Sequence, residues 1–189
     1  MEGRQLLRLL ADGPVIAAVK DAAGLAAALR SDVTVVFLLG FDMLTVSDMV
    51  AKAQQAGKRV FVHVDLVEGL ASREIAVDFI ARNTAADGII STKDSLIRRG
   101  RELGLVTIRR VFLLDSMALA NIERHVSQDS SDLIEVLPGL MPKIIRQLTS
   151  VVKKPIIAGG LICDKEDVTG ALGAGAIAVS TTNPTVWSM

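Results

Sequence analysis

The residues most able to do chemistry stand where apolar segments end. Within residues 59–69, valines alternate with Phe61, His63 and Asp65, and Glu68 follows shortly afterwards. In a β-strand this alternation directs His63 and Asp65 to the face opposite the valines, so Asp65 is expected at the mouth of a binding site. Carboxylates placed there can accept hydrogen bonds from the hydroxyl groups of a small ligand.

Charged residues also lie in, or directly after, other apolar segments. Combined with Asp65 and Glu68, they predict a polar pocket around a hydroxylated ligand. The alternative is that each Asp caps a following helix, and for Asp42 and Asp115 the two interpretations are equally supported. For Asp65 and Glu68 binding is favoured, because an inward carboxylate needs a partner. The further charged residues are Lys20, Asp42, Lys93, Asp115 and Glu135.

Two segments near the end of the chain predict a phosphate site. Gly159 and Gly160 follow one apolar run, and Ser180 and Thr181 end the next. Glycines let backbone N–H groups approach an anion, and eight-stranded barrels often hold a phosphate after their last two strands. The Asn-Pro pair at 183–184 predicts a short helix whose N-terminus faces that anion. A tight glycine turn without a ligand is the alternative.

A basic cluster between residues 93 and 110 could contact nucleic acid phosphates. It sets six basic residues against Asp94 and Glu102. A solvated helix face explains the same pattern and is slightly favoured by the sequence alone. The residues that would contact RNA are Arg98, Arg99, Arg101, Arg109 and Arg110.

These residues must be positioned by a repeating architecture. Eight apolar runs rich in Val and Ile are each followed by a stretch with helical spacing, which is typical of βα units on a parallel sheet. Either a closed barrel or an open doubly wound sheet fits. The eightfold count without a dinucleotide-type glycine motif favours a small (β/α)8 TIM-like barrel. The runs begin near Val15, Val33, Arg59, Gly88, Ile108, Leu133, Ile156 and Ile177.

The two ends of the chain complete this prediction of one domain over residues 1–189. Only a turn or so follows the eighth strand, so the last helix of the barrel is expected to be truncated. Leu6, Leu9 and Leu10 stand at helical spacing near the start, and we expect their helix to cover the gap. Helix starts are predicted at Asp21, Thr45, Pro142 and Asp164, from residue types that favour these positions.

Composition excludes several classes of function. Lys plus Arg and Asp plus Glu both number 21, so bulk charge attracts neither nucleic acid nor an anionic membrane. Aromatic residues make up 3% of the chain, which argues against recognition of single strands by base stacking. One cysteine, Cys163, excludes an intramolecular disulfide and a multi-thiolate zinc site. Without an apolar run of membrane-spanning length, a cytoplasmic protein with no membrane contact is expected. No metal ligand is assigned, and the sequence leaves open whether a metal ion joins the carboxylates.

Five segments resemble the glycerol uptake operon antiterminator regulatory proteins, and the similarity covers nearly the whole chain in order. The Gly-Gly motif alone is shared by many barrels, whereas its combination with the Asp65 to Glu68 segment is much more specific. The matching segments are 63–70 (HVDLVEGL), 88–93 (GIISTK), 135–139 (EVLPG), 155–162 (PIIAGGLI) and 178–182 (AVSTT).

The resemblance implies a bacterial cytoplasmic regulator with a TIM-barrel-like fold. It implies a response to glycerol 3-phosphate and binding to the leader mRNA of glycerol-utilisation genes, where premature termination is prevented. Glycerol 3-phosphate would act as an effector, and no cofactor is expected. The positions that would line its pocket are Lys20, Asp65, Glu68, Lys93, Glu135, Gly159, Gly160, Ser180 and Thr181.

Two other classes of function remain open from the sequence. A small barrel with carboxylates, a lysine and a phosphate site could be an isomerase, lyase or phosphodiesterase acting on a phosphorylated polyol. A purely structural role would leave the ring of polar residues unexplained. Self-association into a homo-oligomer is plausible for a truncated barrel.

Overall fold

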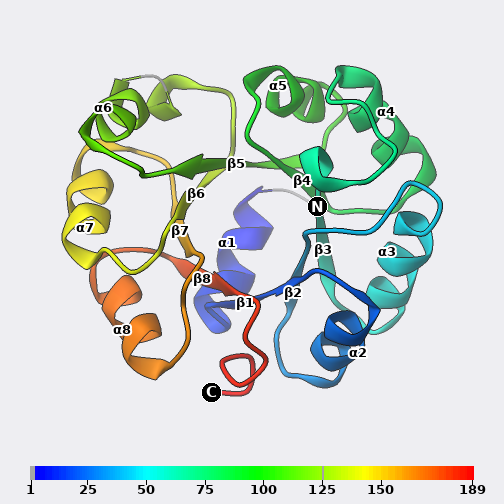
Figure 1. Cartoon of the computed structure of the whole chain (residues 1–189), viewed down its shortest axis with the longest axis horizontal. Helices are drawn as coiled ribbons and strands as arrows, with labels where there is room; N and C mark the ends of the chain where they lie inside the picture. Colours follow the sequence, from blue (N-terminus) through cyan, green and yellow to red (C-terminus); the bar gives the residue numbers. More distant parts are fainter. Residues whose placement is uncertain (1–2, 125) are drawn as a thin grey trace.

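A computed structural model of the chain describes residues 3–124 and 126–189. Within these residues eight parallel strands close into a barrel in chain order, with helices outside the ring (Figure 1). The predicted (β/α)8 barrel is therefore confirmed. The strands are β1 (Val15–Val19), β2 (Val35–Leu38), β3 (Arg59–His63), β4 (Gly88–Ser91), β5 (Val106–Phe112), β6 (Leu133–Leu137), β7 (Ile156–Gly159) and β8 (Ala178–Thr181).

The first residue of each strand is set by hydrogen bonding to the neighbouring strand more than by where the apolar run begins. Three strands begin one or two residues away from the predicted positions, at Val35, Val106 and Ala178. Val106 already pairs with Gly88 of β4, which extends β5 toward its start. Apolar content therefore locates each strand, and pairing with its neighbour sets the first residue.

Seven helices alternate with the strands after an N-terminal helix, in the part of the chain that the structure describes, and two short 3₁₀ turns interrupt the loops. None of these helices is long and apolar enough to cross a membrane. The helices are α1 (Gly3–Asp12), α2 (Ala22–Arg30), α3 (Val46–Gln55), α4 (Glu74–Asn83), α5 (Asp94–Glu102), α6 (Ser116–Arg124), α7 (Pro142–Val151) and α8 (Lys165–Gly173), and the turns are η1 (Val64–Leu66) and η2 (Val126–Gln128).

Most predicted helix starts are confirmed by their capping geometry. Asp21 accepts the N–H of Gly24 at 2.7 Å, and Asp164 accepts the N–H of Asp167 at 2.9 Å. Pro142 is the first residue of α7. These side chains satisfy helix N–H groups or occupy a position where an N–H is not needed.

The start of α3 lies at Thr45 as predicted, but another side chain makes the capping hydrogen bonds. Thr45 makes no capping hydrogen bond with its side chain. Instead, Asp42 accepts the N–H groups of Leu44 and Thr45 at 2.8 and 2.9 Å. The Thr45 hydroxyl also donates to this carboxylate, and that bond holds the pKa of Asp42 below its usual value. Asp115 likewise accepts the N–H of Ala118 at the start of α6, so both residues organise turns.

The lower part of the barrel interior is filled by apolar side chains. Inward residues of every strand, among them Ile16, Phe37 and Phe61, form one buried cluster that also contains Leu6 and Leu10 of α1. α1 lies across the centre of the ring in Figure 1, at the end where the strands begin. The expectation that this helix covers the gap left by the last helix is wrong, because its leucines seal the barrel floor instead.

The gap is filled by the end of the chain. After β8, the N–H groups of Val186 and Trp187 donate to the carbonyls of Asn183 and Pro184, each at 3.2 Å, so a single turn replaces the predicted short helix. Val186 and Trp187 are buried in the layers outside the strands. The last helix is truncated as predicted, and two side chains take over its packing.

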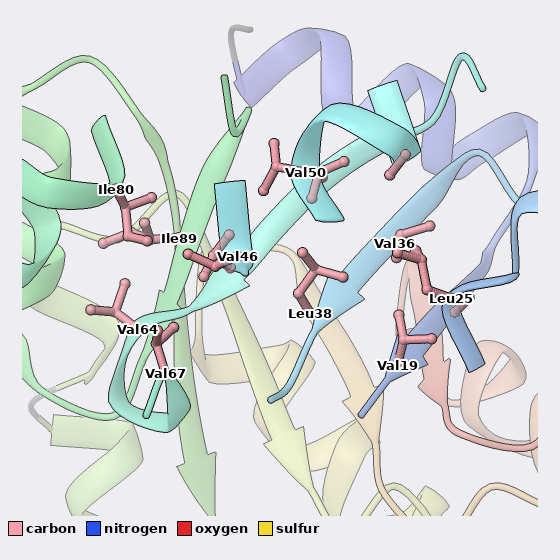
Figure 2. Packing of buried hydrophobic residues seen from close by; sticks show 14 of the residues in the cluster. Val19, Leu25, Val36, Leu38, Val46, Val50, Val64, Val67, Ile80 and Ile89 are labelled. Carbon is pink, nitrogen blue, oxygen red and sulfur yellow. The ribbon is translucent and has the colours of Figure 1, made fainter. Parts of the chain in front are cut away.

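A second apolar layer lies between the strands and the outer helices. Figure 2 shows Val19, Val36 and Leu38 of β1 and β2 packing toward Leu25 of α2 and Val50 of α3, all buried. The barrel wall is thus held between two apolar layers, one inside and one outside. Only the upper interior is left for polar residues.

We expect Leu10→Ala to lower the free energy of unfolding by about 2–5 kcal/mol, because a large side chain is removed from a packed floor. Leu10 is 0% exposed, whereas Leu44 is 84% exposed and provides the control Leu44→Ala. The control is expected to change stability by less than about 0.5 kcal/mol. Urea denaturation measures both; equal midpoints would show that α1 does not seal the barrel.

Candidate functional site

A layer of polar side chains replaces the apolar filling at the top of the barrel. Alternate residues of a strand point to the same side. Phe61 and Ile108 point into the lower core, so His63 and Arg110, two residues later on β3 and β5, also point into the barrel. Glu135 of β6 and Ser180 of β8 complete this layer. All four side chains are polar and buried, although water would otherwise solvate their polar groups.

Glu135 connects the members of this layer. Its side chain is 0% exposed. One carboxylate oxygen accepts the Nε–H of Arg110 at 2.6 Å, and the other accepts the hydroxyl of Ser180 at 2.5 Å. A buried carboxylate is tolerated only when it is paired and hydrogen bonded, and both conditions are met here. Within the described residues, no hydrogen bond uses the Nη groups of Arg110, which leaves them for a ligand.

Gly159 of β7 makes the Glu135 to Ser180 hydrogen bond possible. A Cβ at this position would lie 2.6 Å from Ser180 Oγ and 2.7 Å from Glu135 Oε1. The missing side chain therefore leaves room for two side chains to meet across the intervening strand. This glycine is required by packing within the site, which differs from the predicted approach of its backbone to an anion.

A cavity of about 480 Å³ opens above the polar layer at the carboxyl ends of the strands. It contains five of the predicted site residues, and it adds Arg110 and the residues after β8. Asp65, Glu68, Lys93 and Gly159 are not among its lining residues. The lining residues are Ala18, Lys20, Leu39, Leu66, Arg110, Glu135, Leu137, Gly160, Leu161, Ile162, Cys163, Ser180, Thr181, Thr182 and Asn183.

The rim on the β7 and β8 side is held by a small hydrogen-bond network. Gly160 has φ +75°, which favours glycine, and Leu161 follows with φ +63°. The Thr181 hydroxyl donates to the carbonyl of Ile162 at 2.6 Å, and the Asn183 amide donates to the carbonyl of Cys163 at 2.9 Å. The loop after β7 and the turn after β8 are therefore tied together at the predicted phosphate site.

Asp65 binds the neighbouring strand rather than lining the cavity. Its carboxylate accepts the hydroxyl of Ser91, the N–H of Thr92 at 2.7 Å and the hydroxyl of Thr92. These contacts join the end of β3 to the end of β4. The partner that an inward carboxylate requires is thus supplied by the protein itself.

His63 is buried beneath Asp65 without a strong partner. Among residues 3–124 and 126–189 its Nδ1 finds no hydrogen-bond partner, and it lies 3.8 Å from a carboxylate oxygen of Asp65. Burial, reinforced by the positive charge of Arg110 and opposed by Asp65, lowers the pKa of His63 to about 4. A neutral imidazole therefore stands beside the Arg110 guanidinium near neutral pH.

Glu68 and Lys93 lie on the surface around the mouth. Both side chains are exposed. The backbone of Glu68 exchanges hydrogen bonds with the loop after β2, accepting from Met43 at 2.9 Å and donating to Phe41 at 3.0 Å. These two residues therefore belong to loops that surround the cavity.

The predicted RNA-contacting arginines are distributed over different surroundings. Arg99 pairs with Asp78 and Glu102, and these hydrogen bonds raise the pKa of its guanidinium. Arg101 pairs with Asp132 at 2.7 Å, and Arg98 is exposed on α5. Arg109 is half-buried outside the barrel wall, whereas Arg110 lies inside it.

Arg110 is the cavity residue that sequence reasoning assigned elsewhere. Its place in a linear run of basic residues suggested a surface patch, yet the alternation along β5 from Val106 and Ile108 directs it inward. The same alternation was used for His63 and Asp65, so the signal was present in the sequence.

The arrangement has the groups needed to bind a small anion. Lys20 and Arg110 provide two cations, and Ser180, Thr182 and Asn183 provide neutral polar groups. Both oxygens of Glu135 are already engaged, so this carboxylate positions Arg110 and Ser180. In the described residues, no group of three or more His, Cys, Asp or Glu side chains could hold a metal ion.

Fold and site together define a small TIM-type barrel with an anion-competent cavity at the carboxyl ends of its strands. Deoxyribose phosphate aldolase from Aeropyrum pernix shares this architecture with a TM-score of 0.68 at 14% identity, over 99% of this chain and 97% of that chain. At that identity the likeness shows the fold alone.

The chain belongs to the glycerol-3-phosphate responsive antiterminator family, whose profile matches residues 15–187. It is 34% identical to the glycerol uptake operon antiterminator regulatory protein from Listeria monocytogenes, with a TM-score of 0.89 over 93% of this chain and 95% of that chain. A related Thermotoga maritima protein gives 31% identity and a TM-score of 0.80, over 93% and 98%. YgcP of Escherichia coli K12, described as uncharacterized, is 46% identical over 97% of this chain and 96% of its own. The resemblance predicted from the five segments is confirmed.

His63 is expected to make stability depend on pH between about 4 and 6.5. In this window the unfolded chain binds a proton that the folded chain, with its lowered pKa, does not bind, so stability falls as pH decreases. The loss approaches about 3 kcal/mol at the acidic end. Urea denaturation of the wild type and His63→Gln at pH 7 and pH 4.5 measures it. If His63→Gln lost as much stability between pH 7 and pH 4.5 as the wild type does, this role of His63 would be contradicted.

Gly159→Ala is expected to lower the free energy of unfolding by about 1–3 kcal/mol, because its Cβ would displace Glu135 or Ser180. Gly173→Ala in α8 provides a matched control, since nothing lies within 4 Å of a Cβ there. That change is expected to be neutral or stabilising by up to about 1 kcal/mol. Thermal unfolding of both variants distinguishes the crowded glycine from the open one, and a Gly159→Ala protein as stable as wild type would refute the packing argument.

Proposed function

We propose that this protein binds glycerol 3-phosphate at the barrel mouth, binds the leader mRNA of glycerol-utilisation genes, and promotes transcription antitermination. The observation that carries the proposal is the Arg110 guanidinium, which Glu135 fixes through Nε while its Nη groups remain unused beside the cavity. Membership of an antiterminator family supports a regulator rather than an enzyme.

The cavity has the chemistry needed for a small phosphorylated polyol. Lys20 and Arg110 offer two cations to a phosphate, and charge-assisted hydrogen bonds of this kind are about twice as strong as neutral ones. Gly160 and the turn at Asn183 bring backbone close to the same space. Ser180 and Thr182 offer hydroxyl groups to the glycerol part of the ligand. Asp65, Glu68 and Lys93 then act through the surrounding loops.

The same arrangement suggests how effector binding could affect a second ligand. The loops after β3, β7 and β8 all contribute to the cavity rim, and a ligand that contacts them together would favour one arrangement of the mouth. If that arrangement also binds RNA better, each ligand must strengthen binding of the other by the same factor. Self-association could contribute to such coupling.

Calorimetric titration with glycerol 3-phosphate, alongside glycerol and inorganic phosphate, tests the effector. We expect saturable binding of glycerol 3-phosphate alone at low concentration, with the ligand recovered unchanged. Chemical conversion of the recovered ligand would instead support an enzyme acting on a phosphorylated polyol. Absence of binding would remove the proposed effector.

Variants of the two cations locate the ligand. Arg110→Gln is expected to weaken binding of glycerol 3-phosphate about 10- to 100-fold, because a charge-assisted contact is lost. Because this change also removes the hydrogen bond that Arg110 donates to the buried Glu135, the thermal stability of the variant must be measured beside the titration. Lys20→Met affects an exposed side chain and is expected to weaken binding less, about three- to tenfold, without changing stability. The exposed Arg98→Gln is the matched control, and equal affinities for all three variants would place the ligand elsewhere.

The regulatory part of the proposal is tested with the leader transcript of the host's glycerol-utilisation operon. Affinity for this RNA is measured with and without saturating glycerol 3-phosphate, and affinity for the effector with and without RNA. Equal enhancement in both directions is expected. Enhancement in one direction only would contradict a two-site equilibrium.

A further inference from the structure

Arg109 presents an unexplained buried cation on the outer side of the barrel wall. Adjacent residues of a strand point to opposite faces, so Arg109 points outward where Arg110 points inward. Its side chain is half-buried between the strands and the helices. Its Nε and Nη1 groups are buried and make no hydrogen bond to any residue that the structure describes. Burying unsatisfied donors of a charged group is costly, so these groups call for a ligand.

A cavity of about 290 Å³ adjoins this guanidinium, and we call it the outer cavity. Its lining residues are Asp94, Arg109, Val126, Gln128 and Asp129, so it lies between the start of α5 and η2. One oxygen of Asp129 accepts from the Lys154 ammonium and from Ser131, whereas the other, Oδ2, is buried and has no partner in the described part of the chain. Residues around one cavity therefore leave two donors and one acceptor unsatisfied.

A second hollow of about 300 Å³ continues from the outer cavity toward the barrel mouth. The two share Arg109 and Val126, and the second also includes Asn121 and Phe112. Phe112 is 48% exposed, which is unusual for an aromatic residue in a chain that has so few. An exposed ring beside an unpaired guanidinium offers a surface on which a base can stack.

We propose that the outer cavity and this hollow form a contact site for RNA. A phosphodiester accepts hydrogen bonds from the Arg109 guanidinium, and an adjacent 2′-hydroxyl donates to the Asp129 carboxylate, once these side chains turn their covered Nε, Nη1 and Oδ2 atoms toward the cavity. The unsatisfied groups require an anionic acceptor next to a hydroxyl donor. The RNA backbone carries a phosphate and a 2′-hydroxyl in every nucleotide, whereas DNA lacks that hydroxyl. The inference rests on the proposed function and names the surface that RNA would contact.

The surrounding charges are compatible with this ligand. Asp94 faces the cavity and repels a phosphate, but Arg98 lies one helical turn along α5 on the same face and is exposed. The Lys154 ammonium offsets the charge of Asp129. The lining itself sets Asp94 and Asp129 against Arg109, so the charge balance for an anion depends on Lys154 and Arg98 outside it.

The first experiment measures binding of the leader transcript to Arg109→Gln over a range of salt concentrations. We expect affinity to fall about tenfold and the salt dependence to decrease by about one phosphate contact, while glycerol 3-phosphate binding is retained. Arg30→Gln is the matched control, because Arg30 is exposed on α2, on the far side of the barrel (Figure 1). If the arginine had only a structural role, thermal stability would fall and the salt slope would not change.

The second experiment uses a dinucleotide, so that it does not depend on antitermination. Uridylyl-uridine and its 2′-deoxy counterpart are titrated into the full chain while Arg Nε–Hε signals are followed by NMR, with Arg109→Gln identifying the relevant signal. We expect the ribo form to shift that signal at lower concentration than the deoxy form. If the dinucleotide bound at Arg109 but the protein did not bind the leader transcript, the RNA contact site would stand and the proposed function would be rejected. Unaltered leader binding by Arg109→Gln, or no shift with either dinucleotide, would overturn the inference.

Discussion

The buried carboxylate of Glu135 is the constraint on which the upper barrel depends. At 0% exposure its two oxygens are satisfied by hydrogen bonds that Arg110 and Ser180 donate. Arg110 lies directly opposite Glu135 in the β5 to β6 register, whereas Ser180 is reached across β7. Gly159 supplies the space for that second contact. One carboxylate thereby fixes the relative positions of four consecutive strands.

This constraint separates the barrel into parts with different physical roles. Below the polar layer, apolar residues of every strand and two leucines of α1 close the floor, and their burial stabilises the fold without any polar partner. Above it, cations and hydroxyl groups face an open cavity. Barrels of this type place chemistry at the carboxyl ends of strands and stability at the opposite end, and this chain follows that division.

Strand β5 connects the inside of the barrel to its outer surface. Consecutive residues of a strand face opposite sides, so Arg110 reaches the mouth cavity while Arg109 reaches the outer cavity. Arg110 also lines the hollow that continues from the outer cavity, together with Arg109. The two proposed sites therefore meet at adjacent residues of β5.

The sequence by itself determined the repeating architecture, because the signals for it are local. Alternating apolar residues locate the strands, Asp21, Asp164 and Pro142 mark helix starts, and the segments around Gly160 and Ser180 identify one side of the mouth. The family also follows from contiguous segments. Each of these signals depends on residues that are close together in the chain, where spacing and residue type suffice.

Only the tertiary structure decided which side chains meet. Asp65 looked like a ligand-binding carboxylate until β4 supplied Ser91 and Thr92 as its partners, 26 and 27 residues further along. The linear run of arginines concealed that Arg109 and Arg110 lie on opposite sides of a wall, and nothing local shows that α1 seals the floor. Strand register and barrel closure set these contacts over long separations, and spacing along the chain does not encode them.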